Sequence, residues 1–180
     1  MSPWTKAFPA LGAALFILSG CGAKEFRAEE NPRRPFGEFG KVEGLELQIE
    51  IPDFDKLEPE EQQYVRNLAK SFPELLQARL ARKRLFASEG ADKLVIQGRI
   101  TQFDPGSRTA RWMIGLGAGS GEIVAEIRFD DARGGSVARG TAVGGVSSGL
   151  GGGSIDAAVK RLVDAVVGFI EANYKEVRTP

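Results

Sequence analysis

Cys21 is the residue best placed for covalent chemistry, because it is the only cysteine among the 180 residues of the chain. An intramolecular disulfide bond needs two cysteines, so the Cys21 thiol is available for another modification. An apolar run over residues 7–18 follows Lys6. Ser19 and Gly20 come after this run and directly precede Cys21. This order is typical of a secretory signal, and the run is shorter than the roughly 20 residues that span a bilayer. The alternative is a membrane helix that stays attached, but no apolar residues extend the run beyond Cys21.

The sequence Leu18-Ser19-Gly20-Cys21 resembles the lipobox of bacterial lipoproteins. The resemblance implies cleavage between Gly20 and Cys21, followed by attachment of three acyl chains to Cys21 in a bacterium with two membranes. Each buried methylene contributes about 0.8 kcal/mol, so several chains hold a protein firmly in the bilayer. Gly22 stands where an aspartate would favour retention at the inner membrane. We therefore expect the periplasmic face of the outer membrane as the location.

Several kinds of chemistry are not expected from this composition. The chain has no histidine, the commonest general base and transition-metal ligand. With Cys21 acylated, we expect no zinc, haem or iron–sulfur site, and we predict no cofactor and no catalytic residue. Ser147 and Ser148 have no histidine or lysine nearby to activate them, and Glu58 stands where a calcium loop over the acidic residues 53–61 would need glycine. The sequence therefore predicts a protein that is not an enzyme.

The charge balance argues against nucleic acid as a partner. The chain has 24 basic and 24 acidic residues. Removal of residues 1–20 takes away only Lys6, so the mature chain carries about one net negative charge. No general positive field is expected to attract nucleic acid.

Glycine occupies every second position from 115 to 121, and a second set of glycines lies between residues 144 and 153. In a strand, the first set would face one side and leave a smooth groove. A dinucleotide-binding or Walker loop is excluded, because residue 120 is serine and no Lys-Ser or Lys-Thr follows the glycines. Three interpretations of the glycines remain. They permit a bend or close approach of the backbone, they form a docking surface for a partner, or they cradle a small ligand. The candidate binding surface comprises Arg108, Arg111, Trp112, Gly115, Gly117, Gly119 and Gly121.

Hydrophobic periodicity predicts the elements that must position these residues. Alternating apolar residues predict strands over 42–51, 94–103, 122–130 and 136–146, and a turn at 104–107 predicts another strand over 109–114. Apolar residues three and four apart predict helices that start near Pro59 and Ile155, with a kink or restart at Pro73. The expected fold is α/β (α+β): a mixed four- to five-stranded sheet in the order β-α-β-β-β-β-α, with two helices packed on one face.

The chain is expected to divide into three parts. Residues 1–20 form the signal peptide, residues 21–40 a lipidated flexible tether without hydrophobic periodicity, and residues 41–176 a single α/β domain. Phe36 and Phe39 are expected to dock on the domain and end the flexible part.

The residues Gly98-Arg99-Ile100-Thr101-Gln102-Phe103-Asp104, the alternating glycines and Asp130-Asp131 resemble a family of glycine-rich bacterial lipoproteins with a domain of unknown function. The resemblance covers about residues 40–175. The strand at 98–103 is more distantly similar to periplasmic domains of curli-secretion lipoproteins and of lipoprotein activators of peptidoglycan synthases. These resemblances imply an α/β domain that binds other proteins and has no catalytic centre.

The expected function is that of an outer-membrane-anchored periplasmic lipoprotein that acts as an envelope scaffold or partner-binding domain. The alternative is a module that binds a small ligand such as a glycan fragment or a lipid. In that case Arg108, Arg111 and Trp112 would supply cationic and aromatic contacts.

Overall fold

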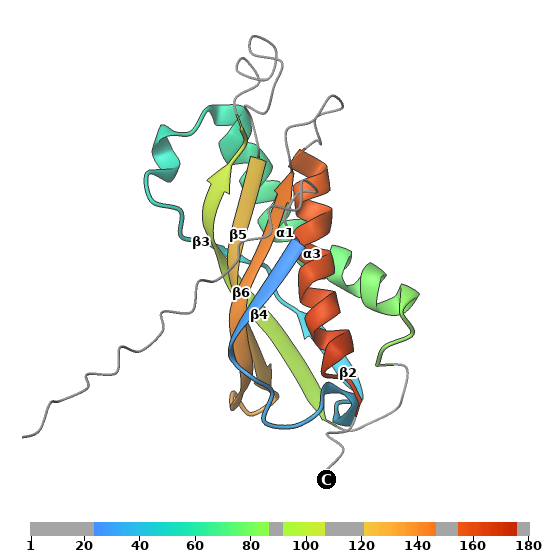
Figure 1. The fold of residues 1–180 in the computed structure, drawn as a ribbon. Helices are drawn as coiled ribbons and strands as arrows, with labels where there is room; N and C mark the ends of the chain where they lie inside the picture. Colours follow the sequence, from blue (N-terminus) through green and yellow to red (C-terminus); the bar gives the residue numbers. More distant parts are fainter. Residues whose placement is uncertain (1–23, 87–91, 107–120, 147–154, 176–180) are drawn as a thin grey trace, which may run out of the picture.

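The centre of the fold is a mixed six-stranded sheet (Figure 1). The computed structural model describes residues 24–86, 92–106, 121–146 and 155–175. The strands are β1 (Lys24–Glu30), β2 (Lys41–Gly44), β3 (Gln48–Ile49), β4 (Lys93–Asp104), β5 (Gly121–Asp131) and β6 (Ser136–Val146). Their order across the sheet is β1-β6-β5-β4-β2, and β3 also pairs with β4. The predicted α+β class is confirmed.

The two helices, α1 (Pro59–Arg82) and α3 (Ile155–Ala172), pack on one face of the sheet. Pro59 occupies the first turn of α1, where its missing N–H costs no hydrogen bond, and the Glu58 N–H donates to Glu61 Oε2 at 3.2 Å. Pro73 lies inside α1, which continues to Arg82. The helix α1 connects β3 to β4, and both β2 and β3 pair with β4 in parallel, as the strand–helix–strand order predicts.

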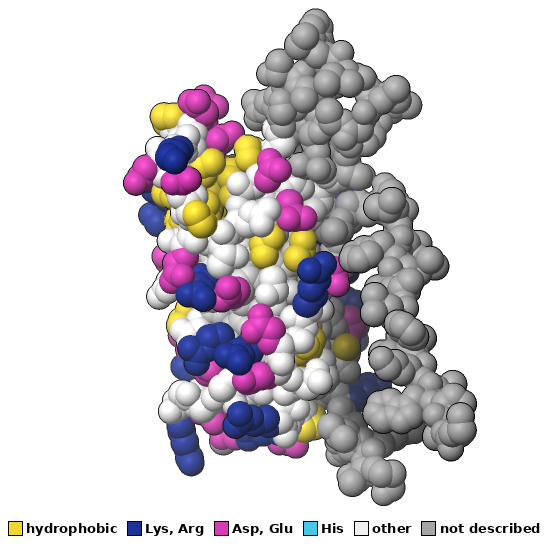
Figure 2. Space-filling model, turned by 60° about the vertical axis from the view of Figure 1, so that its left-hand side comes forward, with side chains coloured by type: hydrophobic (Ala, Val, Ile, Leu, Met, Phe, Trp, Pro, Cys, Tyr) yellow, Lys and Arg dark blue, Asp and Glu magenta, His cyan; other side chains and the backbone are white. Residues whose placement is uncertain are grey.

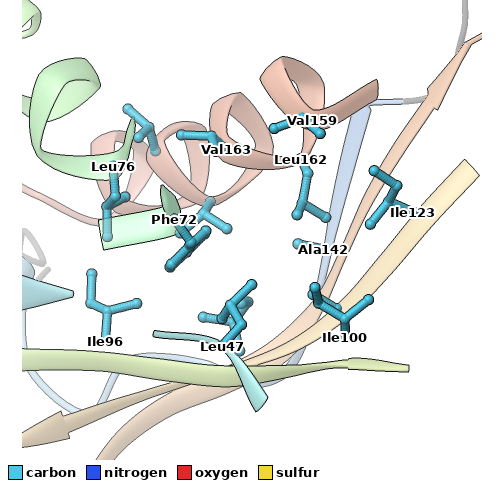
Figure 3. Close-up of a cluster of buried hydrophobic side chains, with 14 of the residues drawn as sticks. Leu47, Phe72, Leu76, Ile96, Ile100, Ile123, Ala142, Val159, Leu162 and Val163 are labelled. Atoms are coloured by element: carbon cyan, nitrogen blue, oxygen red, sulfur yellow. The ribbon is translucent and has the colours of Figure 1, made fainter. Parts of the chain in front are cut away.

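The core lies between the sheet and the helices (Figure 3). In β5 the side chains of Ile123, Ala125, Ile127 and Phe129 are buried, which confirms the face predicted from their alternation. In Figure 3, Phe72 and Leu76 of α1 and Leu162 of α3 point toward the sheet, where Ile96 and Ile100 of β4 lie. Burial of such side chains contributes roughly 1.5–3 kcal/mol each and is the main force that holds the layers together.

Residues 24–39, predicted to lie in a flexible tether, are ordered instead. Lys24–Glu30 form β1, which pairs antiparallel with β6, and Phe36–Glu38 form the short 3-10 helix η1. The flexible-tether prediction is therefore wrong for these residues. Pairing with β6 satisfies the backbone groups on one side of β1, while Phe36 and Phe39 are fully buried, as expected for their docking.

Two irregularities in the strands also differ from the expected pattern. The single strand predicted over 42–51 is divided into β2 and β3. In β4 a register shift between Ile100 and Gln102 changes the alternation, so that Phe103 is buried and Gln102 is exposed. The strand predicted over 109–114 lies outside the described residues.

Neither described helix has the length and apolar character required to cross a membrane.

Candidate partner-binding surface

Most residues of the predicted binding surface lie outside the described part of the chain. Residues 107–120 contain Arg108, Arg111, Trp112, Gly115, Gly117 and Gly119, and residues 1–23 contain Gly20 and Cys21. Gly121 is described: it begins β5, is buried and pairs with Val146 of β6. A Cβ atom at Gly121 would lie 3.3 Å from the Asp104 carbonyl oxygen, so this glycine permits close packing at the end of the sheet.

The described residues present a second candidate surface, on the sheet face that the helices leave open. It arises because side chains alternate along each strand. Glu126 and Arg128 of β5 lie between core residues and therefore point to the open face, as their alternation predicts. The register places Glu126 beside Arg99 of β4 on one side and Thr141 of β6 on the other.

Arg99 is the centre of an ion-pair network on this open face. Its Nε donates to Glu126 Oε2 at 2.8 Å, and its Nη1 donates to Glu50 Oε2 at 2.6 Å. The hydrogen bond to Glu126 and the charges of both carboxylates raise the pKa of Arg99. The guanidinium therefore links β5 and β4 to the segment that follows β3, while all three side chains remain partly exposed.

Further ion pairs extend the network toward the other edge of the sheet. Arg139 Nη2 of β6 lies 3.0 Å from Glu30 Oε1 at the end of β1. Asp130 is buried, with 3% of its surface exposed, and accepts hydrogen bonds from Gln97 Nε2 at 2.6 Å and Arg128 Nη2 at 3.2 Å. A buried carboxylate needs such partners, so Asp130 fixes the orientation of Gln97 and Arg128 on the open face.

The charged side chains surround a shallow hollow of about 720 Å³. Its lining includes four arginines and five glutamates: Arg33, Arg99, Arg128, Arg139, Glu29, Glu30, Glu46, Glu50 and Glu126. Figure 2 brings this side of the molecule forward and shows basic and acidic side chains intermingled over its middle. Leu45, which is 38% exposed, adds an apolar contact at the hollow. The arrangement can recognise a surface of alternating charge.

The hollow offers charged and polar side chains for contacts with another molecule. Ser136 is the one hydroxyl-bearing residue among the residues that line it. Among the described ranges, no group of three or more His, Cys, Asp or Glu residues is arranged to hold a metal ion.

The chain matches the family described as "Domain of unknown function (DUF4410)" over residues 40–152. It belongs to this family. This match confirms the resemblance to a family with a domain of unknown function that the glycine-rich motifs indicated. The DUF4410 match contains β2 to β6 and α1, whereas β1 and α3 of this chain lie outside it.

The DUF4410 chain is also similar to two solved structures of PelC dodecamers from Paraburkholderia phytofirmans, one of them of a single-residue variant. The variant shares 12% sequence identity with this chain, with a TM-score of 0.49. The match covers 82% of this chain and 96% of the PelC chain. The second structure is 12% identical with a TM-score of 0.44, and the match covers 78% and 95% of the two chains. A comparison with curated proteins finds no match.

Proposed function

We propose that this protein is a lipoprotein of the bacterial envelope that binds a partner protein and performs no catalysis. Acylated Cys21 anchors it to the periplasmic face of the outer membrane. The lipobox-like sequence before Cys21 supports the anchor, and Gly22 supports the outer rather than the inner membrane. The folded domain then acts as a scaffold.

The observation that carries the binding role is the charged, open face of the sheet. Helices α1 and α3 cover the opposite face, and the ion pairs of Arg99 hold opposite charges in a fixed pattern across β5, β4 and the segment that follows β3. Exposed ion pairs contribute only about 0–1 kcal/mol each to stability. Complementary charge mainly sets which partner binds and how fast, so this pattern suits recognition better than stabilisation.

Site-specific photo-crosslinking in bacterial cells tests the proposed surface. A photoreactive residue at Glu126 on the open face is expected to capture a defined partner, whereas one at the exposed Glu74 on α1 is the matched control. Arg99→Glu should abolish the crosslink at position 126, because it removes the positive charge at the centre of the network and places a second negative charge beside Glu50. Equal crosslinking at positions 74 and 126, or no effect of R99E, would contradict a role for the open face.

The anchor requires a separate test. Cells are labelled with a fatty-acid analogue, and the membranes are separated by density. The protein should carry the label and sediment with the outer membrane, whereas Cys21→Ser should lose both properties. An unlabelled full-length protein in the soluble fraction would contradict the anchor without bearing on the open face.

A second candidate function is binding of a small ligand such as a glycan fragment or a lipid. The hollow of about 720 Å³, with its arginines, favours this candidate. A large rise in melting temperature with muropeptides or lipids, and no crosslinked protein, would support it over the scaffold.

A further inference from the structure

We propose that the end of the sheet at which β1 begins faces the membrane, and that the turn between β5 and β6 points away from it. This inference rests on the proposed acylation of Cys21. It adds the orientation of the domain, which the lipid anchor alone does not determine.

The argument starts from the short connection between the anchor and the sheet. Only Gly22 and Ala23 separate Cys21 from Lys24, the first residue of β1. Three residue steps reach at most about 10 Å, even when the chain is fully extended. Lys24 is held in the sheet by its pairing with Gly144 of β6. Because the acyl chains must lie in the bilayer, this corner of the sheet lies within about 10 Å of the lipid anchor.

The strand register identifies which other described residues share that end. Gly121 at the start of β5 pairs with Val146 at the end of β6, two positions beyond Gly144. The first turns of α3 lie here as well, because a Cβ atom at Gly144 would be 2.1 Å from the Ala158 carbonyl oxygen. This end is the upper end of the sheet in Figure 1, where α3 begins.

The opposite end is the turn between β5 and β6, where Gly134 adopts a φ of 81°. It lies at the bottom of Figure 1. The eleven residues of β5 separate the two ends. At roughly 3.3 Å per residue they place the ends about 35 Å apart, several times the reach of the connection to Cys21. A long flexible tether would let either end approach the membrane, but the ordered β1 removes that freedom.

A spin-label measurement on the full lipidated protein tests this orientation. Acylated Cys21 has no free thiol, so a nitroxide attaches only to an introduced cysteine. Lys160→Cys places it on the second turn of α3, and Ala132→Cys places it at the β5–β6 turn; both native residues are exposed. The proteins are reconstituted in phosphatidylethanolamine–phosphatidylglycerol vesicles that contain a nickel-chelating lipid, which enhances the relaxation of nearby nitroxides.

The relaxation enhancement is expected to be several-fold larger at position 160 than at position 132. A flexible insertion of about ten Gly and Ser residues after Ala23 should reduce this difference, because a coil of that length spans roughly 15–20 Å on average. Equal or reversed enhancement would overturn the orientation, and a difference that survives the insertion unchanged would overturn the short connection as its cause. Failure of the protein to float with vesicles would instead overturn the anchor, so the two proposals fail in distinguishable ways.

Discussion

The backbone of α3 lies directly against Gly144 of β6: a Cβ atom at Gly144 would be 2.1 Å from the Ala158 carbonyl oxygen and 2.6 Å from the Leu162 nitrogen. At this position the second glycine set permits close approach between a helix and a strand, which is the packing interpretation of these glycines. The contact joins α3 to the sheet at the end where β1 begins.

Gly144→Ala is therefore expected to lower the free energy of unfolding by about 1–3 kcal/mol, because the added methyl group must displace the backbone of α3. The matched control is Gly168→Ala in α3, since a Cβ atom at Gly168 would meet nothing within 4 Å. The control should raise stability by about 0.5–1 kcal/mol through helix propensity. Urea unfolding measures both, and equal effects of the two variants would show that the contact is not tight.

Phe26 makes β1 part of the stable fold. Its ring stacks on Phe169 of α3 with centroids 4.2 Å apart and planes inclined by 17°. Phe26→Ala should cost about 2–4 kcal/mol in the free energy of unfolding, because it leaves a gap between β1 and α3. Arg27→Ala, whose side chain is 67% exposed, should change stability by less than about 0.5 kcal/mol. Equal, small effects of both variants in urea unfolding would mean that β1 contributes little to stability.

Tyr64 links α1 to α3 and should make stability depend on alkaline pH. Its hydroxyl donates a hydrogen bond to Asp156 Oδ1 at 2.8 Å. Partial burial, followed by this hydrogen bond and the carboxylate charge, raises the pKa of Tyr64 above its ordinary value of 10.0. The folded state then holds the phenol proton more tightly than the unfolded chain. The stabilisation is present below about pH 10 and is lost as the pH rises beyond it.

Tyr64→Phe should lower the free energy of unfolding by about 1 kcal/mol at neutral pH, because it removes the hydrogen bond. It should also reduce the loss of stability above about pH 10, because phenylalanine does not titrate. Urea unfolding at a series of alkaline pH values measures the difference between the two proteins. A difference that stays constant through this range would contradict the role of Tyr64.

Gly117, in the alternating glycine series, provides a test of partner docking outside the described residues. Gly117→Val should reduce capture of the partner, measured as the yield of the crosslink at position 126, while the domain still unfolds cooperatively in urea. Ala118→Val is the control, because the strand alternation predicts that residue 118 faces the other side. Loss of folding in G117V, without a specific loss of capture, would assign the glycines a structural role.

The elements found from the sequence are those whose apolar side chains repeat clearly. In α3, the buried residues Val159, Leu162, Val166 and Ile170 recur at intervals of three and four, and β5 alternates from Ile123 to Phe129. β1 has no such signal, because its sequence KEFRAEE contains one large apolar residue, Phe26. Its order depends on β6 and α3, which lie more than 100 residues later in the chain, and local periodicity carries no information about such partners.

The open face could be predicted only in part. Alternation shows that Glu126 and Arg128 point away from the core, but it does not show which charges meet. The pairs of Arg99 with Glu126 and Glu50 join residues separated by 27 and 49 positions. Their meeting depends on the register between strands and on the division of the predicted strand 42–51 into β2 and β3.

The pairing of β1 with β6 has a consequence for secretion. Thr141 Oγ1 in β6 donates to Glu29 Oε1 in β1 across a separation of 112 residues, although β1 leaves an export channel first when translocation starts at the N-terminus. If the chain is exported as we propose, β1 waits until most of the polypeptide has emerged, and the sheet closes late. During this interval the backbone of β1 and the ring of Phe26 have no native partner, so the proposed export intermediate would be a client for chaperones.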